Sequence, residues 1–252
     1  MAVSLLSSMP RMKVMPNHIH YNAAISACDR GGQWQMALSL LNVMLHVRVR
    51  RDEISFNAAM SACSKGGQWQ LALSLLSIMR GKRLVPDGFS CSSAIGACEQ
   101  EGKWDMALSL LRSMPEIQVI PTPITYNAAI AACNRGGQWQ MVLGLLRRMV
   151  DTRLIPNKVS YTMAIAGCKT AGQWQLALSL LTAMPRMKVS PDAVSCNAAI
   201  STCSAARQWE LSLSLLADMS HMRLVPDETS HGSAISCFGE VGSHWDVALL
   251  LL

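Results

Sequence analysis

The chain has 252 residues, of which 50% are hydrophobic and 5% aromatic, and its 22 Lys and Arg against 16 Asp and Glu give a formal net charge of +6. The sequence contains no run of 18 or more apolar residues, which excludes an ordinary membrane-spanning helix. The net charge is mild for a nucleic-acid-binding protein, so charge alone does not identify a partner.

An internal repeat organises the whole sequence. Tryptophan recurs at five intervals of 35 residues and a last interval of 36, as Trp34, Trp69, Trp104, Trp139, Trp174, Trp209 and Trp245. A fixed period of this size indicates one supersecondary unit copied in tandem, each copy being stable only when stacked on its neighbours. We therefore predict a single array over residues 1–252, with full repeats at 18–52, 53–87, 88–122, 123–157, 158–192 and 193–227.

The two ends of the array are predicted to be incomplete repeats. Residues 1–17 match the second half of a repeat, and residues 228–252 form a partial, divergent copy. Solenoid arrays normally end in repeats with polar outer faces, and neither end has one. We therefore expect either a piece of a longer array or an incomplete gene model.

Each repeat is predicted to form two helices joined by a short turn. In the copy at 18–52 the first helix has its core face at Tyr21, Ile25 and Cys28, spaced i, i+4, i+7. Gly31 and Gly32 end this helix. The second helix is expected over about 33–46, with a buried stripe that comprises Trp34, Ala37, Leu38, Leu41 and Met44. The pattern predicts an all-α solenoid of tandem helix-turn-helix hairpins.

The cysteines and methionines follow the same period. Six of the nine cysteines occupy one place in the repeat, namely Cys28, Cys63, Cys98, Cys133, Cys168 and Cys203, and no CxxC motif occurs. A buried free thiol behaves as a small hydrophobic group, so we predict core packing for these residues and for the methionines that end the second helices. No metal and no cofactor are expected.

The first helix has another face, away from the core, where residues such as Ile19, Asn22, Ser26 and Asp29 lie together. Stacked repeats are expected to align this face into a groove. At what we call the groove position the repeats hold Asn22, Asn57, Ser92, Asn127, Thr162 and Asn197, followed by Gly232. At the last position of each repeat they hold Asp52, Asp87, Thr122, Asn157, Asp192 and Asp227. At the apolar position, three residues before the groove position, they hold Ile19, Ile54, Phe89, Ile124, Val159 and Val194.

Several features that recur in phase resemble the pentatricopeptide repeat, of the type with uniform 35-residue copies. These features are YN in the first helix, Gly before the second helix, Ala within it, Met at its end and PD at the close, as in residues 21–22 and 86–87. The resemblance covers essentially the whole chain. Tetratricopeptide repeats differ, since their period is 34 and their Trp lies in the first helix. The resemblance implies a right-handed α-solenoid.

The resemblance also implies sequence-specific binding of single-stranded RNA, with one base read by each repeat. Apolar positions of successive repeats would sandwich a base, while the groove and last positions meet its Watson–Crick edge. Asp only accepts hydrogen bonds and therefore suits the imino N–H of U or G, whereas Asn can also donate to C or A. In the family's code, Asn at the groove position favours pyrimidines, and the shorter Ser or Thr favours purines.

Applied pair by pair, the code predicts a site of about 5′-UUR(C/U)GU-3′. Asn22/Asp52, Asn57/Asp87 and Asn197/Asp227 are expected to prefer U, Asn127/Asn157 to prefer C with U tolerated, and Thr162/Asp192 to prefer G. Ser92/Thr122 favours a purine and leaves A and G open, and Gly232 is assigned no base. The basic residues near the end of the first helix are candidates for phosphate contacts: Arg30, Lys65, Arg135 and Lys169.

No motif for catalysis is present in the sequence. It contains no HxE with a downstream CxxC, no phosphate-binding Walker loop and no nucleophile elbow, so we predict that the chain is not an enzyme. The favoured function is an RNA-binding adaptor in organellar RNA processing, stability, editing or translation, in a mitochondrion or chloroplast by family resemblance. Protein partners would then supply any catalytic activity. The alternative is a scaffold whose groove holds a protein or peptide, and the narrow choice of residues at the groove and last positions favours RNA.

Overall fold

The computed structural model describes residues 6, 9 and 15–241, and over this part of the chain it contains α-helices and no β-strand. The first helices of the repeats are α2 (His18–Arg30), α4 (Glu53–Lys65), α6 (Gly88–Gln100), α8 (Pro123–Arg135), α10 (Lys158–Thr170), α12 (Ala193–Ala205) and α14 (Glu228–Val241). The second helices are α3 (Trp34–His46), α5 (Trp69–Gly81), α7 (Trp104–Ser113), which is followed by the 3-10 helix η2 (Pro115–Ile117), α9 (Trp139–Asp151), α11 (Trp174–Arg186) and α13 (Trp209–His221). The prediction of an all-α protein made of tandem hairpins is confirmed. Most of the predicted partial repeat at 1–17, and the end of the divergent copy with Trp245, lie outside the described residues.

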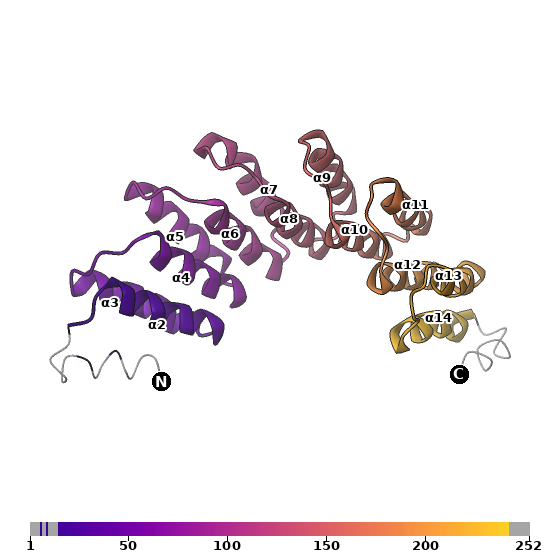
Figure 1. The fold of residues 1–252 in the computed structure, drawn as a ribbon, viewed down its shortest axis with the longest axis horizontal. Helices are drawn as coiled ribbons and strands as arrows, with labels where there is room; N and C mark the ends of the chain where they lie inside the picture. The colour runs from indigo at the N-terminus through magenta and orange to yellow at the C-terminus, as the bar shows by residue number, and fades with distance from the viewer. Residues whose placement is uncertain (1–5, 7–8, 10–14, 242–252) are drawn as a thin grey trace. The chain divides into compact units, whose positions relative to one another are not determined.

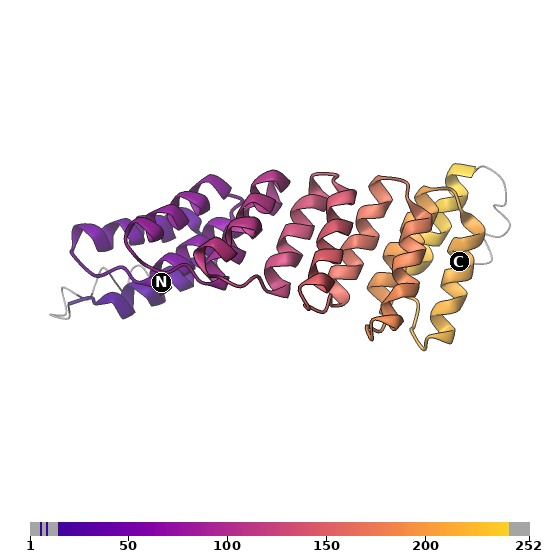
Figure 2. The same ribbon diagram turned by 90° about the horizontal axis from the view of Figure 1, so that it is seen from above.

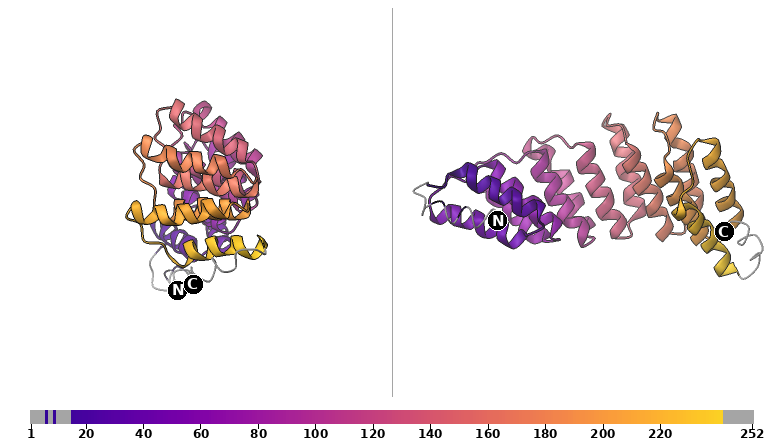
Figure 3. Two further views of the ribbon diagram at one scale, coloured as in Figure 1. Left: turned by 90° about the vertical axis from the view of Figure 1, so that its right-hand side faces the viewer. Right: turned by 60° about the horizontal axis from the view of Figure 1, so that its bottom comes forward.

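The chain divides into two compact units, Met1–Gly136 and Gly137–Leu252. In the first unit α2, α4, α6 and α8 pack side by side, and each of α3, α5 and α7 packs against its own first helix and the next one (Figure 1). In the second unit α10, α12 and α14 pack in the same way, each of α11 and α13 packs against its own first helix and the next one, and α9 packs against α10 (Figure 2). Each unit is therefore a stack of hairpins in chain order (Figure 3). That the two form one array stays a prediction.

The turn inside each hairpin requires a left-handed residue. Gly32, Gly67, Gly102, Gly137 and Gly172 have φ between +61° and +68°, a conformation that costs glycine little. In the sixth repeat Arg207 occupies the same place with φ +58°. In the six full repeats the second helix begins two residues later, at the recurring Trp.

Each second helix ends in another left-handed residue. Arg48, for example, has φ +55°, and the N–H of the following Val49 donates to the carbonyl of Met44 at 2.9 Å, the six-residue bond of a Schellman motif. Arg83, Gln118, Arg153, Lys188 and Arg223 have the same conformation. Five of the six left-handed residues that terminate the second helices are therefore basic, the exception being Gln118.

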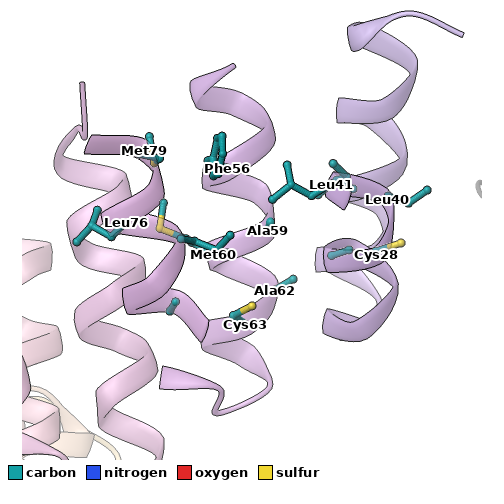
Figure 4. Close-up of a cluster of buried hydrophobic side chains, with 14 of the residues drawn as sticks. Cys28, Leu40, Leu41, Phe56, Ala59, Met60, Ala62, Cys63, Leu76 and Met79 are labelled. Carbon is teal, nitrogen blue, oxygen red and sulfur yellow. The ribbon is translucent and has the colours of Figure 1, made fainter. Parts of the chain in front are cut away.

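The core lies between the first and second helices. Tyr21, Ile25 and Cys28 of α2 are buried, as predicted, and so are the corresponding Phe56, Met60 and Cys63 of α4, which lie beside Leu76 and Met79 of α5 (Figure 4). The nine cysteines are all buried free thiols. Met44, Met79, Met114, Met149, Met184 and Met219 are at most 1% exposed, which confirms their predicted role in the core.

The predicted stripe of the second helix needs two corrections. Leu40 is buried together with Ala37, Leu41 and Met44, although it was not predicted, whereas Trp34 and Leu38 are only partly buried. Trp34 packs against the buried cluster and also reaches the next repeat, because a Cβ atom on Gly66 would lie 2.3 Å from its Cδ1. Trp104 contacts Gly136 in the same way. At these two places the glycine that follows a first helix thus makes room for the tryptophan of the preceding repeat.

Candidate nucleic-acid interface

The apolar position forms an exposed row on the first helices. The exposed fractions are 62% for Ile19, 61% for Ile54, 55% for Phe89, 70% for Ile124, 48% for Val159 and 64% for Val194. Each of these residues is the second residue of its helix. Single exposed apolar side chains are common in proteins. Packing in the core does not explain why an exposed apolar side chain recurs at the same position of all six full repeats. The row can contact flat apolar surface such as a base.

The last position of each repeat is the N-cap of the next first helix. Asp52 has an extended backbone with φ −111°, and its Oδ1 accepts from the N–H of Ser55 at 2.9 Å. The hydroxyl of Ser55 in turn accepts from the N–H of Asp52 at 3.3 Å, which completes a capping box. The same boxes begin α6, α8, α10 and α12, with Asp87, Thr122, Asn157 and Asp192 as caps.

Helix capping offers a second explanation for the narrow choice of residues at the last position, which from the sequence alone indicates RNA binding. Asp, Asn and Thr are among the residues that N-caps prefer, because their side chains accept hydrogen bonds from free helix N–H groups. The restriction therefore has a structural cause, and by itself it does not distinguish an RNA-binding groove from a peptide-binding one. The restriction at the groove position does not follow from capping, since residues such as Asn22 lie inside the first helix.

The groove and last positions meet in the first repeat. The Nδ2 group of Asn22 donates to Oδ1 and Oδ2 of Asp52 at 3.0 and 3.1 Å. The hydroxyl of Ser55 donates to Oδ1 of Asn22 at 2.6 Å and lies 2.8 Å from Oδ1 of Asp52. Sequence analysis did not identify this serine, although the Ser three residues after the cap is the pattern of a capping box.

The same three-residue network recurs twice. Asn57 Nδ2 donates to Asp87 Oδ2 at 3.1 Å, and Ser90 Oγ donates to Asn57 Oδ1 at 2.6 Å. In the second unit Asn197 Nδ2 donates to Asp227 Oδ1 at 3.1 Å, and Ser230 Oγ donates to Asn197 Oδ1 at 2.6 Å. Asn197 Nδ2 also donates to the hydroxyl of Thr229 at 2.7 Å. The structure therefore brings together three of the six predicted pairs.

The other pairs are arranged differently. Ser92 Oγ donates to the carbonyl of Gly88 in its own helix at 2.6 Å, and the Thr122 hydroxyl accepts from the N–H of Thr125 at 3.4 Å. Among the described residues, no hydrogen bond joins Ser92 to Thr122. Asn127 lies in the first unit and Asn157 in the second, so their pairing stays a prediction.

Thr162 and Asp192 line a cavity of about 270 Å³. Its other lining residues are Lys158, Val159, Met163 and Val194, so it includes the apolar positions of two successive repeats. Within the described part of the chain, Thr162 makes no hydrogen bond to Asp192. The cavity volume is just below the roughly 300–1,000 Å³ of small-molecule sites, a size that suits part of a nucleotide.

The caps are acceptors at neutral pH. Burial by itself would raise the pKa of Asp52 and of Asp87, but hydrogen bonds from the capping serine and from the groove asparagine together lower both values below the usual range. The pKa of Asp227 is lowered too, first by the Thr229 hydroxyl and then by Ser230. These side chains are therefore carboxylates, which can only accept hydrogen bonds.

The candidate phosphate contacts divide into two kinds. Lys65 lies 3.0 Å from Asp29 Oδ1 of the preceding repeat in an ion pair, and Lys169 donates to the Ser201 hydroxyl at 2.7 Å. Arg30 and Arg135 end α2 and α8 with exposed side chains. A role for any of the four in phosphate binding stays a prediction.

Neither a metal site nor a membrane-spanning helix is found among the described residues. Across residues 15–241 no group of three His, Cys, Asp or Glu side chains is placed to hold a metal ion. In the same part of the chain, no helix combines the length and the hydropathy needed to cross a membrane.

Comparison with known proteins places these observations in a family. The model of the pentatricopeptide repeat domain matches residues 4–66, 74–135 and 144–206, and a second model, of the PPR repeat, matches residues 54–84 and 124–153. No curated protein is similar enough in sequence to match the chain.

Solved structures with the same fold include proteins of this family. The crystal structure of the pentatricopeptide repeat protein PPR10 from maize has a TM-score of 0.72 at 21% identity, over 92% of this chain and 33% of that one. PPR10 in complex with an 18-nt PSAJ RNA element gives a TM-score of 0.65 at 17% identity, over 99% of this chain and 41% of that one. The PPR domain of Arabidopsis thaliana protein-only RNase P 1 in complex with tRNA gives 0.60 at 15% identity, over 71% of this chain and 95% of that one. This chain thus spans about a third to two fifths of PPR10.

Proposed function

The chain belongs to the pentatricopeptide repeat family, and on that premise we propose that it binds single-stranded RNA in a sequence-specific manner, with one base read by each repeat. The observation that carries the proposal is the recurring network of a groove asparagine, a capping aspartate and a buried serine. It recurs as Asn22–Asp52–Ser55, Asn57–Asp87–Ser90 and Asn197–Asp227–Ser230, beside exposed apolar side chains.

The network offers a donor and an acceptor side by side. The amide Nδ2 of Asn57 has two N–H bonds, one of which is directed at Asp87 Oδ2, so the second can donate to a ligand. A carboxylate oxygen accepts two hydrogen bonds, so Asp87 Oδ2 can accept a second one. Uracil presents an imino N–H next to a carbonyl oxygen, which is the complementary pattern. An Asn/Asp pair therefore suits U.

The serine fixes which way the amide points. Ser90 is fully buried, and its hydroxyl donates to Oδ1 of Asn57, so the oxygen of that amide is turned inward and its NH₂ group toward Asp87. A flipped amide would place an N–H against the hydroxyl and lose the bond to the carboxylate. Orientation in advance of binding reduces the entropy lost when a base is recognised.

The cavity beside Thr162 supports a purine in the fifth place of the site. Thr162 is shorter than Asn, makes no bond to Asp192 among the described residues, and leaves about 270 Å³ between Val159 and Val194. Asp192 supplies an acceptor for the imino N–H of G. We therefore retain the predicted site of about 5′-UUR(C/U)GU-3′.

A peptide-binding scaffold is the alternative, because an exposed apolar row can also hold side chains of an extended peptide. It gives no reason for the donor–acceptor pairs at the groove. Fluorescence anisotropy distinguishes the two functions: labelled 5′-UUGCGU-3′ should bind at least about tenfold more tightly than 5′-AAAAAA-3′, which matches the site at one base in any register, or than the duplex, since each hydrogen bond lost to a base edge costs roughly 0.5–1.5 kcal/mol. Equal affinity for all three RNAs would contradict sequence-specific binding.

The biological role follows from the family and is part of the same proposal. The chain would act as an adaptor that places bound RNA before protein partners with catalytic activity, in organellar RNA processing, stability, editing or translation. Immunoprecipitation after ultraviolet crosslinking, followed by sequencing of the bound RNA, tests the role and the compartment together, because the transcripts recovered identify their genome of origin.

A further inference from the structure

A cluster of positive charge in the first unit lies at the junction between α3 and α4. A cavity of about 510 Å³ opens there, and its lining has four cationic side chains and three aliphatic ones: Arg48, Arg50, Arg51, Lys82, Leu45, Val49 and Leu84. Those seven residues include no carboxylate. The next residue in the chain, Asp52, directs its carboxylate at Asn22 and Ser55 instead.

This junction differs in sequence from the others. Arg50 and Arg51 stand where the later junctions have an uncharged residue followed by proline, namely Val85–Pro86, Ile120–Pro121, Ile155–Pro156, Ser190–Pro191 and Val225–Pro226. The side chain of Val85 is 69% exposed and that of Val225 84%, so this place faces solvent in other repeats. The first junction therefore has two additional charges at a place that the fold leaves accessible.

One of the cationic side chains is held in position by a ring contact. The guanidinium of Arg51 lies over the Phe56 ring, 5.6 Å from its centroid. Leu45, Val49 and Leu84 offer apolar surface along which arginine stems can lie while their charged groups reach the opening. A planar guanidinium can bind two oxygens of a phosphate group at once, and arginine is the preferred residue for this purpose.

We propose that this cavity binds phosphate groups of the RNA backbone next to the first base that the protein reads. The inference rests on the proposed function, because its ligand is the same RNA strand. The location supports it: Arg51 and Asp52 are consecutive, so their Cα atoms are about 3.8 Å apart, and Asp52 belongs to the first base-reading pair. The site would therefore bind the charged phosphate groups whatever the bases attached to them.

The test variant is Arg50→Val/Arg51→Pro, which installs the Val-Pro pair found at residues 85–86 and is therefore compatible with the fold. The matched control is Arg147→Ala/Arg148→Ala, which removes two exposed charges from α9 in the other unit. For both variants and the unmodified chain, binding of an RNA that extends the predicted site on both sides is measured between about 50 and 300 mM salt.

The slope of log K against log[salt] is negative, and in the test variant it should become shallower by about 1 to 1.5. The reason is that two phosphate contacts contribute about −0.7 each. Base preference should stay the same, and the control should change the slope much less. Equal slopes in the test and control variants would overturn the proposal while leaving the proposed function intact.

A second measurement does not depend on RNA. Pyrophosphate should raise the thermal midpoint of the unmodified chain and the control but not that of the test variant, and an equal rise in all three would overturn the placement of the anion site at Arg50 and Arg51. If the chain binds pyrophosphate here but binds no RNA, the proposed function is wrong. The proposal that the cavity binds RNA phosphate is then wrong as well, and the cavity is an anion site of another kind. If pyrophosphate has no effect but the slope becomes shallower, the cavity recognises phosphate only within a strand, as proposed.

Discussion

Asn57 and Asp87 are joined by a hydrogen bond of 3.1 Å between Nδ2 and Oδ2, which connects the middle of α4 to the N-cap of α6. The residues are thirty positions apart in the chain, and the contact links two hairpins of the stack. The same aspartate therefore begins a helix and orients the groove asparagine. Changes at either residue should affect base preference, helix stability or both.

The substitution Asn57→Thr should move the preference at the second base of the site from U toward G. Thr162, which is predicted to prefer G, shows the arrangement expected: it is not bonded to its aspartate in the described structure and leaves a cavity beside it. Binding of four RNAs that differ only at the second base measures the change. Asn197→Thr is the matched control and should alter only the sixth base, so an unchanged preference at the second base in Asn57→Thr would refute the assignment.

Stability at acid pH should depend on the capping aspartates. Because hydrogen bonds lower the pKa of Asp52, Asp87 and Asp227 in the folded chain, each contributes stability above the unfolded value of about 3.9. That contribution is lost as the pH falls through the folded pKa values. Asp87→Asn keeps a good N-cap but cannot ionise.

Thermal unfolding of Asp87→Asn and the unmodified chain from about pH 7 to about pH 2.5 checks this expectation. The unmodified chain should lose more stability than the variant below about pH 4, and above that pH the two curves should be parallel. Parallel curves over the whole range would show that the Asp87 carboxylate does not favour the folded state.

The cysteines should be unreactive in the folded chain. Burial raises the pKa of Cys63, Cys133 and Cys168 to about 11, so on the order of one thiol in a thousand is ionised at pH 8. Alkylation by iodoacetamide, followed by mass spectrometry, should label all nine only after unfolding. Ser77→Cys places a thiol on the exposed surface of α5 as a positive control, and labelling of native cysteines at the rate of that thiol would contradict their burial.

The turn in the sixth repeat should be strained. Arg207 has φ +58° where five other repeats have glycine, and a side chain in this conformation costs roughly 1–2 kcal/mol. Arg207→Gly should therefore raise the free energy of unfolding by about 1 kcal/mol. The reverse change at the equivalent place, Gly172→Ala, should lower it by a similar amount, and chemical denaturation measures both. A loss of stability in Arg207→Gly would mean that contacts of the arginine outweigh the strain.

The repeat period was enough to predict the helices and most of the core, because a 35-residue copy must bury the same face each time. Tyr21, Ile25 and Cys28 are buried as their spacing predicts. Trp34 packs against the core as predicted, but its additional contact with Gly66 belongs to the surface between repeats, which spacing within one repeat does not reveal.

Sequence predicted that the groove and last positions lie together, but it did not predict the serines that bond to the groove asparagines. The hydrogen bond between Asn22 and Ser55 joins residues 33 positions apart, so no local pattern indicates it. The restriction at the last position was attributed to base reading, whereas the structure shows that Asp52 and its equivalents are N-caps. Helix capping and base recognition favour the same residue types. The sequence alone therefore does not show that these residues cap helices, whereas the structure does.

Selection from a pool of randomised single-stranded RNA is the most direct test of the central claim, that groove and last positions together read consecutive bases. The account predicts enrichment of sequences that contain 5′-UUR(C/U)GU-3′, with the second U replaced by G when Asn57→Thr is used in parallel. Enrichment of an unrelated sequence, or none, would contradict it.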